Sequence, residues 1–361
     1  MDMIMEVNSS FSPSASTRMN RSEKSSHQPS FNIKRIFNCC LPEQELNSNE
    51  EHLNNLEYGV FDKPKVAHTI QVFTHNNANQ TMSSDMCESI LTSTSDIVFI
   101  STEEMKNLSG VMRETINGSK YVIVYNSAQK MLTVTKPKEL FSLFTNPAST
   151  AQITLVKKGI AAPIIIDKLN YRDVINNPNK GGTITIQSIG SMKVAMVNIH
   201  LDSRDQDERK KEISDLLCKI NNKHTDIDHI IIAGDFNTRN RKVDGRIVRA
   251  LQDKESFRSE LGVLPQYEIT LPMISSQENT YKWEAGLNAE AKQGSKRQKN
   301  GEMQTGYLDG VVILTPKGKI KDETLKKSII VPEGNSIVGP SYGSDHRSVS
   351  AKFAIEKIRS S

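Results

Sequence analysis

The sequence predicts an α/β fold in which two β-sheets pack against each other as a sandwich. Many short runs have the length and apolar pattern of strands, and only a few helical runs separate them. The chain has 361 residues, of which 36% are hydrophobic, so it can bury the core of one large domain.

Residues 1–64 differ in composition from the rest of the chain. The first 31 residues are rich in Ser and Asn and lack apolar periodicity, which predicts disorder. Residues 31–41 form a short amphipathic segment that contains Cys39 and Cys40. This segment has two interpretations, a palmitoylated membrane anchor or a short stretch without that role. We expect the catalytic domain over residues 65–357.

Strands are predicted where β-branched or alternating residues cluster, as in Ile230–Ala233. A helix is predicted over Gln206–Asn221, because Ile213, Leu216 and Ile220 recur at helical spacing. The other expected helices are 85–92 and 246–253, and the other expected strands are 67–73, 96–100, 121–125 and 131–134 (a hairpin around Asn126-Ser127-Ala128), 153–156, 162–166, 183–189, 193–200, 308–314 and 348–353.

Charge and cysteine usage limit the functional classes. The formal net charge of +4 permits an anionic substrate but is weaker than the basic bias of a dedicated nucleic-acid-binding protein. Four cysteines show neither zinc-site spacing nor a disulfide framework, which favours a reducing compartment. No run of 18 apolar residues and no secretory signal pattern occur. We therefore expect a cytoplasmic location, with membrane association if the cysteine pair is lipidated.

Two polar motifs that are far apart in the sequence indicate chemistry. Gly234-Asp235-Phe236-Asn237 follows a buried strand, and Asp345-His346 precedes another. A strand end holds polar groups rigidly, and this combination suits metal-assisted attack of water on phosphorus. Each motif alone is also common in ordinary turns and loops, so the hypothesis of phosphoester hydrolysis rests on their joint occurrence.

Further polar residues follow other predicted strands. Asn198 and His200 alternate along one strand and therefore point to the same face. Asn76 and Glu103 end two further strands, and such oxygen donors suit Mg²⁺, with Mn²⁺ as the alternative cation.

The order of these motifs resembles the endonuclease/exonuclease/phosphatase superfamily. The matching segments, which span about residues 65–355, are Thr74-His75-Asn76, Thr102-Glu103, Asn198-Ile199-His200, Gly234-Asp235-Phe236-Asn237, Tyr307-Leu308-Asp309 and Ser344-Asp345-His346. The resemblance implies a four-layer α/β sandwich, with two packed, mainly antiparallel sheets flanked by helices, that hydrolyses phosphoesters with Mg²⁺.

The resemblance also implies roles for individual residues. Glu103 and Asn76 would bind the metal, and Asp235 would orient or deprotonate the attacking water. Phosphate contacts are implied for Asn237, His200 and His346, a position near the metal or water for Asp345, and support of the imidazole of His346 for Asp309. The chain departs from the usual pattern at His75, where Trp or Tyr is usual, and at Glu104, a second acid after Glu103 that is the alternative metal-binding glutamate.

Within this superfamily, several segments are similar to inositol polyphosphate 5-phosphatases. They are Lys180-Gly181-Gly182, Asn198-Ile199-His200-Leu201, Asn237-Thr238-Arg239, Thr280-Tyr281-Lys282-Trp283 and Lys296-Arg297. The likeness implies substrate contacts by Asn198, Arg239, Tyr281, Lys282, Lys296 and Arg297. Clustered cations could hold the phosphates of an inositol phosphate or a phosphoinositide.

Other functions stay open. Tyr307-Leu308-Asp309-Gly310 is closer to nucleases and sphingomyelinases than to 5-phosphatases, so DNA or RNA cleavage and phosphodiesterase action are alternatives. The basic loop 289–304 has a second interpretation as a solvated surface segment. A disordered N-terminus with a cysteine pair is what we expect of a protein that acts at a membrane surface, such as a bacterial effector secreted into a host cytosol.

Overall fold

A computed structural model describes the chain over residues 66–78, 80–105, 116, 118–130, 149–172, 180–203, 205–244, 246–274, 279–281, 306–317 and 328–357. The chain divides into two units, residues 1–45 and 46–361, and all that follows concerns the second. The predictions for residues 1–64 and 131–134, for Cys39 and Cys40, and for Lys282, Lys296 and Arg297 lie outside the described residues.

The first sheet has the strand order β13-β15-β1-β2-β4-β3, and β14 also pairs with β15. Its strands are β1 (Val66–Asn76), β2 (Ile97–Met105), β3 (Tyr121–Lys130), β4 (Ser149–Lys157), β13 (Ser328–Pro332), β14 (Ile337–Val338) and β15 (Val349–Lys357). The pair β1 and β2 is parallel, and the other pairs are antiparallel.

The second sheet has the order β11-β12-β8-β7-β6-β5, and only β7 and β8 are parallel. Its strands are β5 (Ile164–Arg172), β6 (Gly181–Ile189), β7 (Met192–His200), β8 (His229–Asp235), β11 (Tyr267–Thr270) and β12 (Asp309–Pro316). The strands β9 (Arg241–Val243) and β10 (Arg246–Val248) form a separate pair.

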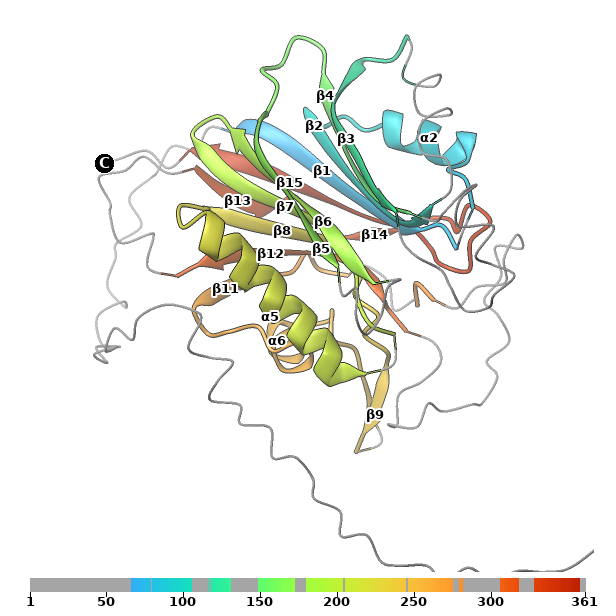
Figure 1. Cartoon of the computed structure of the whole chain (residues 1–361). Helices are drawn as coiled ribbons and strands as arrows, with labels where there is room; N and C mark the ends of the chain where they lie inside the picture. The colour runs from blue at the N-terminus through green and yellow to red at the C-terminus, as the bar shows by residue number, and fades with distance from the viewer. Residues whose placement is uncertain are drawn as a thin grey trace, which may run out of the picture. The chain divides into compact units, whose positions relative to one another are not determined.

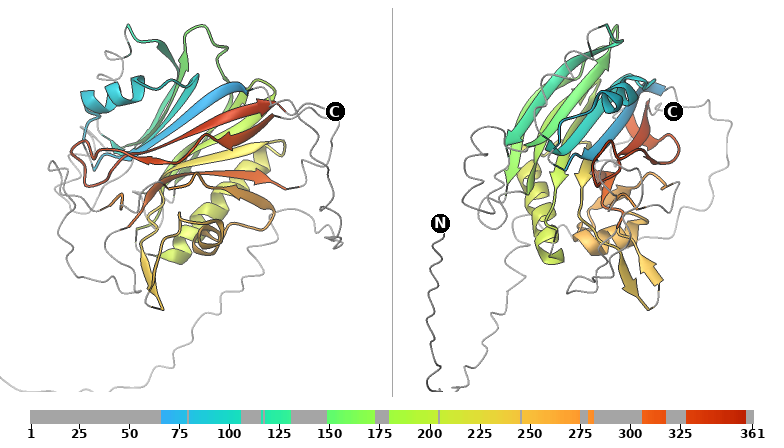
Figure 2. Two further views of the ribbon diagram at one scale, coloured as in Figure 1. Left: turned by 180° about the vertical axis from the view of Figure 1, so that it is seen from behind. Right: turned by 90° about the vertical axis from the view of Figure 1, so that its right-hand side faces the viewer.

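Four layers result, as Figure 1 and Figure 2 show. Helix α2 (Ser84–Leu91) covers the outer face of the first sheet. Helices α5 (Gln206–Lys223) and α6 (Lys254–Leu261) cover the outer face of the second. A third apolar cluster fills the space between the sheets. The predicted four-layer sandwich is therefore confirmed. A central strand such as β8 is buried along its whole length, so it carries apolar side chains on both faces of its sheet.

Two predicted local elements are wrong. The helix predicted over Arg246–Asp253 is instead strand β10 followed by a loop, and α6 begins after Asp253. The Asp253 carboxylate accepts a hydrogen bond from the backbone N–H of Ser256, so this residue caps the start of a helix and does not end one. The turn predicted at residues 126–128 is absent, because β3 continues through it and pairs with β4.

Within the part of the chain that the structure describes, we find no helix that is long and apolar enough to cross a membrane.

Because β8 packs closely beside β7, we predict that the stability of the fold depends strongly on Gly234. This residue has a φ of 144°, and a Cβ atom there would lie 2.0 Å from the carbonyl oxygen of Ile199. We expect Gly234→Ala to lower the free energy of unfolding by ~3 kcal/mol or more, because the backbone must shift. Urea unfolding measures the loss. The control is Gly159→Ala, with a φ of 87° and open space around it, which should cost only ~1 kcal/mol. Equal losses would contradict this account.

Candidate active site

Strand register brings the polar motifs to one edge of the sandwich. In the second sheet, His200 pairs with Asp235 across β7 and β8, and Asp235 pairs with Asp309 across β8 and β12. In the first sheet, Asn76 pairs with Glu103 across β1 and β2. Nδ2 of Asn76 donates to Oδ2 of Asp235 over 3.2 Å and so joins the two sheets at this edge. All five side chains are buried.

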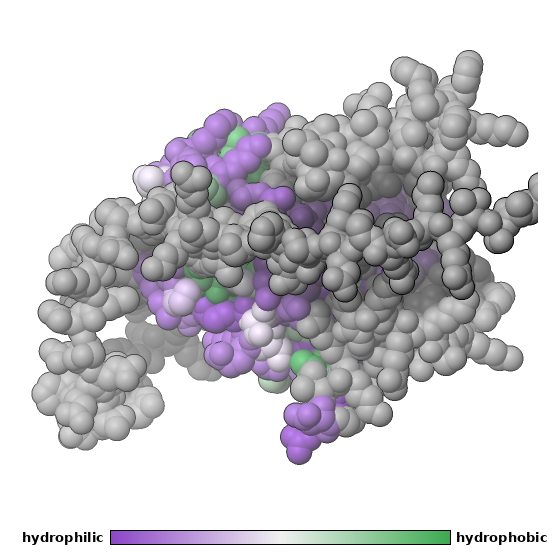
Figure 3. Space-filling view, turned by 60° about the horizontal axis from the view of Figure 1, so that its bottom comes forward, coloured by the Kyte–Doolittle hydropathy of each residue, from purple (hydrophilic) through white to green (hydrophobic). Residues whose placement is uncertain are grey.

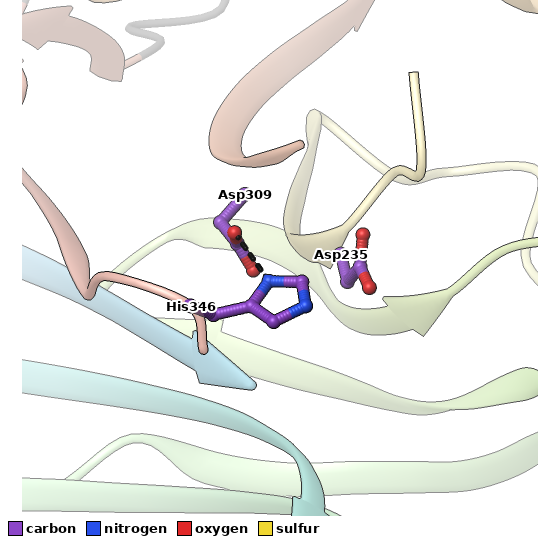
Figure 4. A group of neighbouring side chains, drawn as sticks. All are labelled: Asp235, Asp309 and His346. Atoms are coloured by element: carbon purple, nitrogen blue, oxygen red, sulfur yellow. Dashed lines mark hydrogen bonds and ion pairs between the residues drawn. The ribbon is translucent and has the colours of Figure 1, made fainter. Parts of the chain in front are cut away.

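Asp309 and His346 form a hydrogen-bonded pair in the site. Nδ1 of His346 donates to Oδ2 of Asp309 over 2.9 Å, and the other ring nitrogen points towards Asp235 (Figure 4). The Oγ1 atom of Thr280 accepts the backbone N–H groups of Leu308 and Asp309, which fixes this turn. The sequence-based prediction that Asp309 supports His346 thus has the geometry it requires.

Neighbouring charges set the protonation of this pair. Burial lowers the pKa of His346, but the carboxylates of Asp309, Asp235 and Asp345 outweigh burial and raise it to about 9. Burial raises the pKa of Asp309 to about 6, against the opposing effect of His346. Between these two values the pair consists of an imidazolium and a carboxylate, so a donor with a positive charge faces the site at neutral pH.

Asp235 is held in its ionised form. Burial raises the pKa of Asp235, but the charges of the nearby His346 and Lys180 oppose burial, and the pKa is lowered. Oδ1 of Asp235 also accepts the backbone N–H of Asn237 over 2.9 Å. An ionised, oriented carboxylate at this point can accept a proton from water.

Lys180, which had no predicted role, and Glu104, the alternative metal-binding glutamate, complete the environment of His200. The Lys180 ammonium makes a short contact with Nε2 of His200. Oε1 of Glu104 lies 3.7 Å and Oδ2 of Asp235 lies 3.5 Å from the same nitrogen. Burial and the Lys180 charge keep the pKa of His200 well below its usual range, so this imidazole is neutral. The Lys-Gly-Gly segment and the double acid were the sequence signals for these residues.

Glu103 carries the signature of a cation site. Its side chain is fully buried, and Oε1 accepts a hydrogen bond from the hydroxyl of Ser101. Oε2 of Glu103 and Oδ1 of Asp309 have no hydrogen-bond partner in the described part of the chain. Burial, with the charges of Asp309 and Asp235, raises the pKa of Glu103 well above its usual range. These buried, unpartnered carboxylate oxygens fit a hard divalent cation, which would offset their repulsion.

Ligand atoms from Asp235, Asp309 and His346 also lie within 4.8 Å of one another. We do not count His346 as a metal ligand, because Nδ1 of His346 is occupied by Asp309 and the ring is protonated. The carboxylates of Asp309 and Asp235 act on Glu103 and so border the cation site there.

Arg239 and Tyr281 border the site beside His346. The Arg239 guanidinium lies 4.6 Å from the centre of the Tyr281 ring, which itself lies 4.6 Å from the His346 ring. Backbone bridges join Tyr281 to Gly306 and to His346. The structure therefore brings together these two predicted substrate-binding residues and the catalytic candidate His346.

The side-chain NH₂ groups of Asn198 and Asn237 make structural hydrogen bonds to backbone carbonyl oxygens. Nδ2 of Asn198 donates to the carbonyl oxygens of Thr102 and Ala151 in the other sheet, and Oδ1 has no partner in the described part of the chain. Nδ2 of Asn237 donates to the Leu201 carbonyl. Asp345 is half-buried beside His346. Ligand contacts of these three residues stay predictions.

His75, which replaces the expected Trp or Tyr, is buried and packs edge-on against Tyr342 with ring centres 5.7 Å apart. Burial and the charge of His346 lower the pKa of His75 to about 3, so it acts as a neutral ring.

The chain belongs to the endonuclease/exonuclease/phosphatase family. The pattern of "Endonuclease/Exonuclease/phosphatase family 2" matches residues 73–266, more than half of the chain. Members of this family are hydrolases that act on phosphoesters. The superfamily resemblance found in the sequence is thus confirmed. No curated protein sequence matches the chain.

Solved structures share the fold at low sequence identity. The inositol polyphosphate 5-phosphatase domain of SPsynaptojanin, in complex with inositol (1,4)-bisphosphate and calcium ion, is 14% identical, with a TM-score of 0.51 over 80% of this chain and 84% of that chain. Cimex nitrophorin, in a ferrous NO complex, is 10% identical, with a TM-score of 0.52 over 81% of this chain and all of that chain. D. rerio TDP2 with a single-strand DNA product is 14% identical, with a TM-score of 0.47 over 79% and 98%. The likeness to the first two structures establishes the fold alone, and the site residues must decide the chemistry.

The Asp309–His346 pair yields a prediction about protonation. We expect Asp309→Asn to lower the pKa of His346 from about 9 to below its ordinary value of about 6.5, because burial then acts with less opposition. An NMR titration of the His346 ring in metal-free protein measures this change. The control variant is Asp226→Asn, an exposed acid, which should leave the titration unchanged. A pKa that stays near 9 in Asp309→Asn would show that other groups hold the proton.

Proposed function

We propose that this protein is a Mg²⁺-dependent phosphatase that removes a phosphate from an inositol phosphate or a phosphoinositide. The convergence of Asp235, Asp309 and His346 beside the unpartnered carboxylate oxygen of Glu103 is the observation that carries the hydrolytic part of this proposal. Acid, base and cation-binding groups meet in one buried place, as hydrolysis of a phosphoester requires.

In the proposed reaction, Asp235 orients water and accepts its proton as the water oxygen attacks phosphorus. The bond from phosphorus to the ester oxygen breaks, and the alcohol leaves after taking a proton from solvent. The charged His346 donates a hydrogen bond to a phosphate oxygen from the ring nitrogen that Asp309 leaves free. A divalent cation held by Glu103, with Asn76 beside it, would polarise the phosphate and offset its negative charge.

The choice of substrate rests on Arg239 beside Tyr281 and on basic segments that are similar in sequence to those of 5-phosphatases. Arg239 stacks on the Tyr281 ring, and Lys282 follows Tyr281 directly in the sequence. Lys296 and Arg297 precede the strand that begins at Asp309, as a Lys-Arg pair does in 5-phosphatases. Several cations in such segments would suit a ring that carries more than one phosphate.

A sphingomyelinase-like action receives less support. Large apolar side chains that are well exposed, such as Ile164 and Met273, are scattered over the described surface. On the face shown in Figure 3, the coloured residues are mainly hydrophilic, with apolar spots that are small and separate. We therefore propose that a phosphoinositide substrate is recognised by its phosphorylated headgroup.

Phosphate release from a panel of inositol phosphates and phosphoinositides tests the proposal. We expect release that requires Mg²⁺ and falls by about 10³-fold or more in Asp235→Asn, because the base is lost. The matched control Asp226→Asn changes an exposed acid before the amino end of β8 and should retain activity. Removal of metal with a chelator should abolish release, and added Mn²⁺ should restore part of it.

The same protein is incubated with DNA and RNA in the same buffer. Strand cleavage that needs Asp235, without phosphate release from any inositol compound, would replace the phosphatase proposal with a nuclease. Release that is equal in Asp235→Asn and wild type would contradict the assigned site.

A further inference from the structure

Two charged side chains are buried on the inner face of helix α5. Arg209 and Glu212 lie three residues apart there and are 0% and 1% exposed. Other residues of the helix, such as Ile213 and Leu216, belong to the apolar core. Burial of a charge costs stability unless partners compensate it, and an apolar side chain would cover the sheet at lower cost. Two charges at such positions therefore indicate a constraint other than packing.

Both residues bind the backbone of Asp202, in the loop that follows β7. Oε2 of Glu212 accepts the backbone N–H of Asp202 over 2.7 Å, and Nη1 of Arg209 donates to the Asp202 carbonyl oxygen over 3.3 Å. Nη2 of Arg209 also donates to Oε1 of Glu260 on α6 over 3.1 Å, which fixes the guanidinium. We call Arg209 and Glu212 the α5 clamp, because they hold both backbone polar groups of one residue.

The clamped loop is also bonded to the site. Asp202 lies two residues after His200, and between them Leu201 donates its backbone N–H to the carbonyl oxygen of Asp235 over 3.0 Å. The Leu201 carbonyl oxygen accepts a hydrogen bond from Nδ2 of Asn237 over 2.9 Å. The loop is thus attached both to the end of β8 and to α5, so the clamp limits its movement relative to the site.

The α5 clamp bears on Lys180, whose ammonium is buried and contacts Nε2 of His200. Burial lowers the pKa of Lys180, and this effect is opposed by the carboxylates of Asp235, Glu104, Glu212 and Asp202. Two of these four are Glu212 of the clamp and Asp202, the residue that the clamp holds. Helix α5 and its loop therefore supply part of the negative charge that a buried ammonium requires.

The charge of Lys180 in turn affects the groups around it. Together with His346 it opposes the effect of burial on the pKa of Asp235, and together with burial it lowers the pKa of His200. If Lys180 were a neutral amine, Asp235 would bind a proton more tightly, because burial would act with less opposition. The ionised state of the proposed base thus depends in part on residues of α5.

We propose that Arg209 and Glu212 are positioning residues for the reaction. They hold the loop at Asp202, and the carboxylates of Glu212 and Asp202 keep the Lys180 ammonium beside His200 and Asp235. Both residues of the clamp act through Lys180 and not on the reacting atoms themselves. The inference rests on the proposed function for its effect on turnover, whereas the state of Lys180 can be tested without a substrate.

Glu212→Gln tests the inference, because glutamine keeps an oxygen that can accept the Asp202 N–H and removes the charge. We expect the Lys180 amine to lose about tenfold in its affinity for a proton. A pH titration of the Lys180 signal by NMR in metal-free protein measures this change. In the assay of phosphate release, kcat should fall by about tenfold, since Asp235 loses part of the charge that keeps it ionised.

Asp202→Asn is the second variant. Asparagine keeps an oxygen that can accept the backbone N–H of Asp205, and the clamp still binds the backbone, but one carboxylate that acts on Lys180 is lost. This variant should fold like wild type and change the Lys180 titration in the same direction. Asp215→Asn, which changes an exposed acid on the same helix, is the matched control and should leave the titration and kcat unchanged.

The NMR titration separates this inference from the proposed function. If wild type releases phosphate from no inositol compound, the proposed function fails, and the state of Lys180 still decides on the clamp. A Lys180 signal that titrates alike in wild type, Glu212→Gln and Asp202→Asn would overturn the inference. It would also be overturned by an unchanged kcat in Glu212→Gln, or by a loss of kcat without a change at Lys180, which would indicate a purely structural role.

Discussion

Repulsion among buried carboxylates is the constraint on which the rest of this site depends. Glu103, Asp235 and Asp309 come from neighbouring strand ends and are all buried. Like charges in a place of low dielectric cannot coexist without compensation. The positive charge of His346 compensates the charge of Asp309, and the ammonium of Lys180 compensates the charge of Asp235. Glu103 has no cation of its own among the described residues, which is why a divalent metal fits beside it.

The same edge depends on how the two sheets are held together. Much of the space between them is apolar, but a polar strip runs along one side. In that strip Thr185 donates to Gln152, and the Asn198 amide donates to two carbonyl oxygens of the facing sheet. Buried polar links are directional, so they fix the relative placement of the sheets more narrowly than apolar contact does. A shift of one residue in the pairing register of a strand would turn its site residues to the other face of the sheet.

The fold class and the main motifs were predictable from the sequence because they depend on local pattern. Buried strands such as β8 reveal themselves by β-branched runs, and residues directly after them must lie at a sheet edge. The errors arose where local pattern is ambiguous. Arg246–Asp253 has an apolar spacing that suits a helix, yet the capping side chain of Asp253 sets the start of α6 beyond it. Pairing with β4 continues β3 through residues that resemble a turn, since a ladder of hydrogen bonds outweighs weak turn propensity.

The sequence by itself determined the sandwich, the family and the residue types of the site. Tertiary structure decided which of these residues meet and in what state. The positions of Lys180 and Glu104 in the site could not be assigned from the sequence, because these residues meet only where separate strands converge around His200. The charged state of His346 and the neutral state of His200 likewise depend on neighbours that are far away in the chain. Local sequence encodes strands and turns, whereas distances between groups from separate strands, and therefore their electrostatics, exist only in the folded chain.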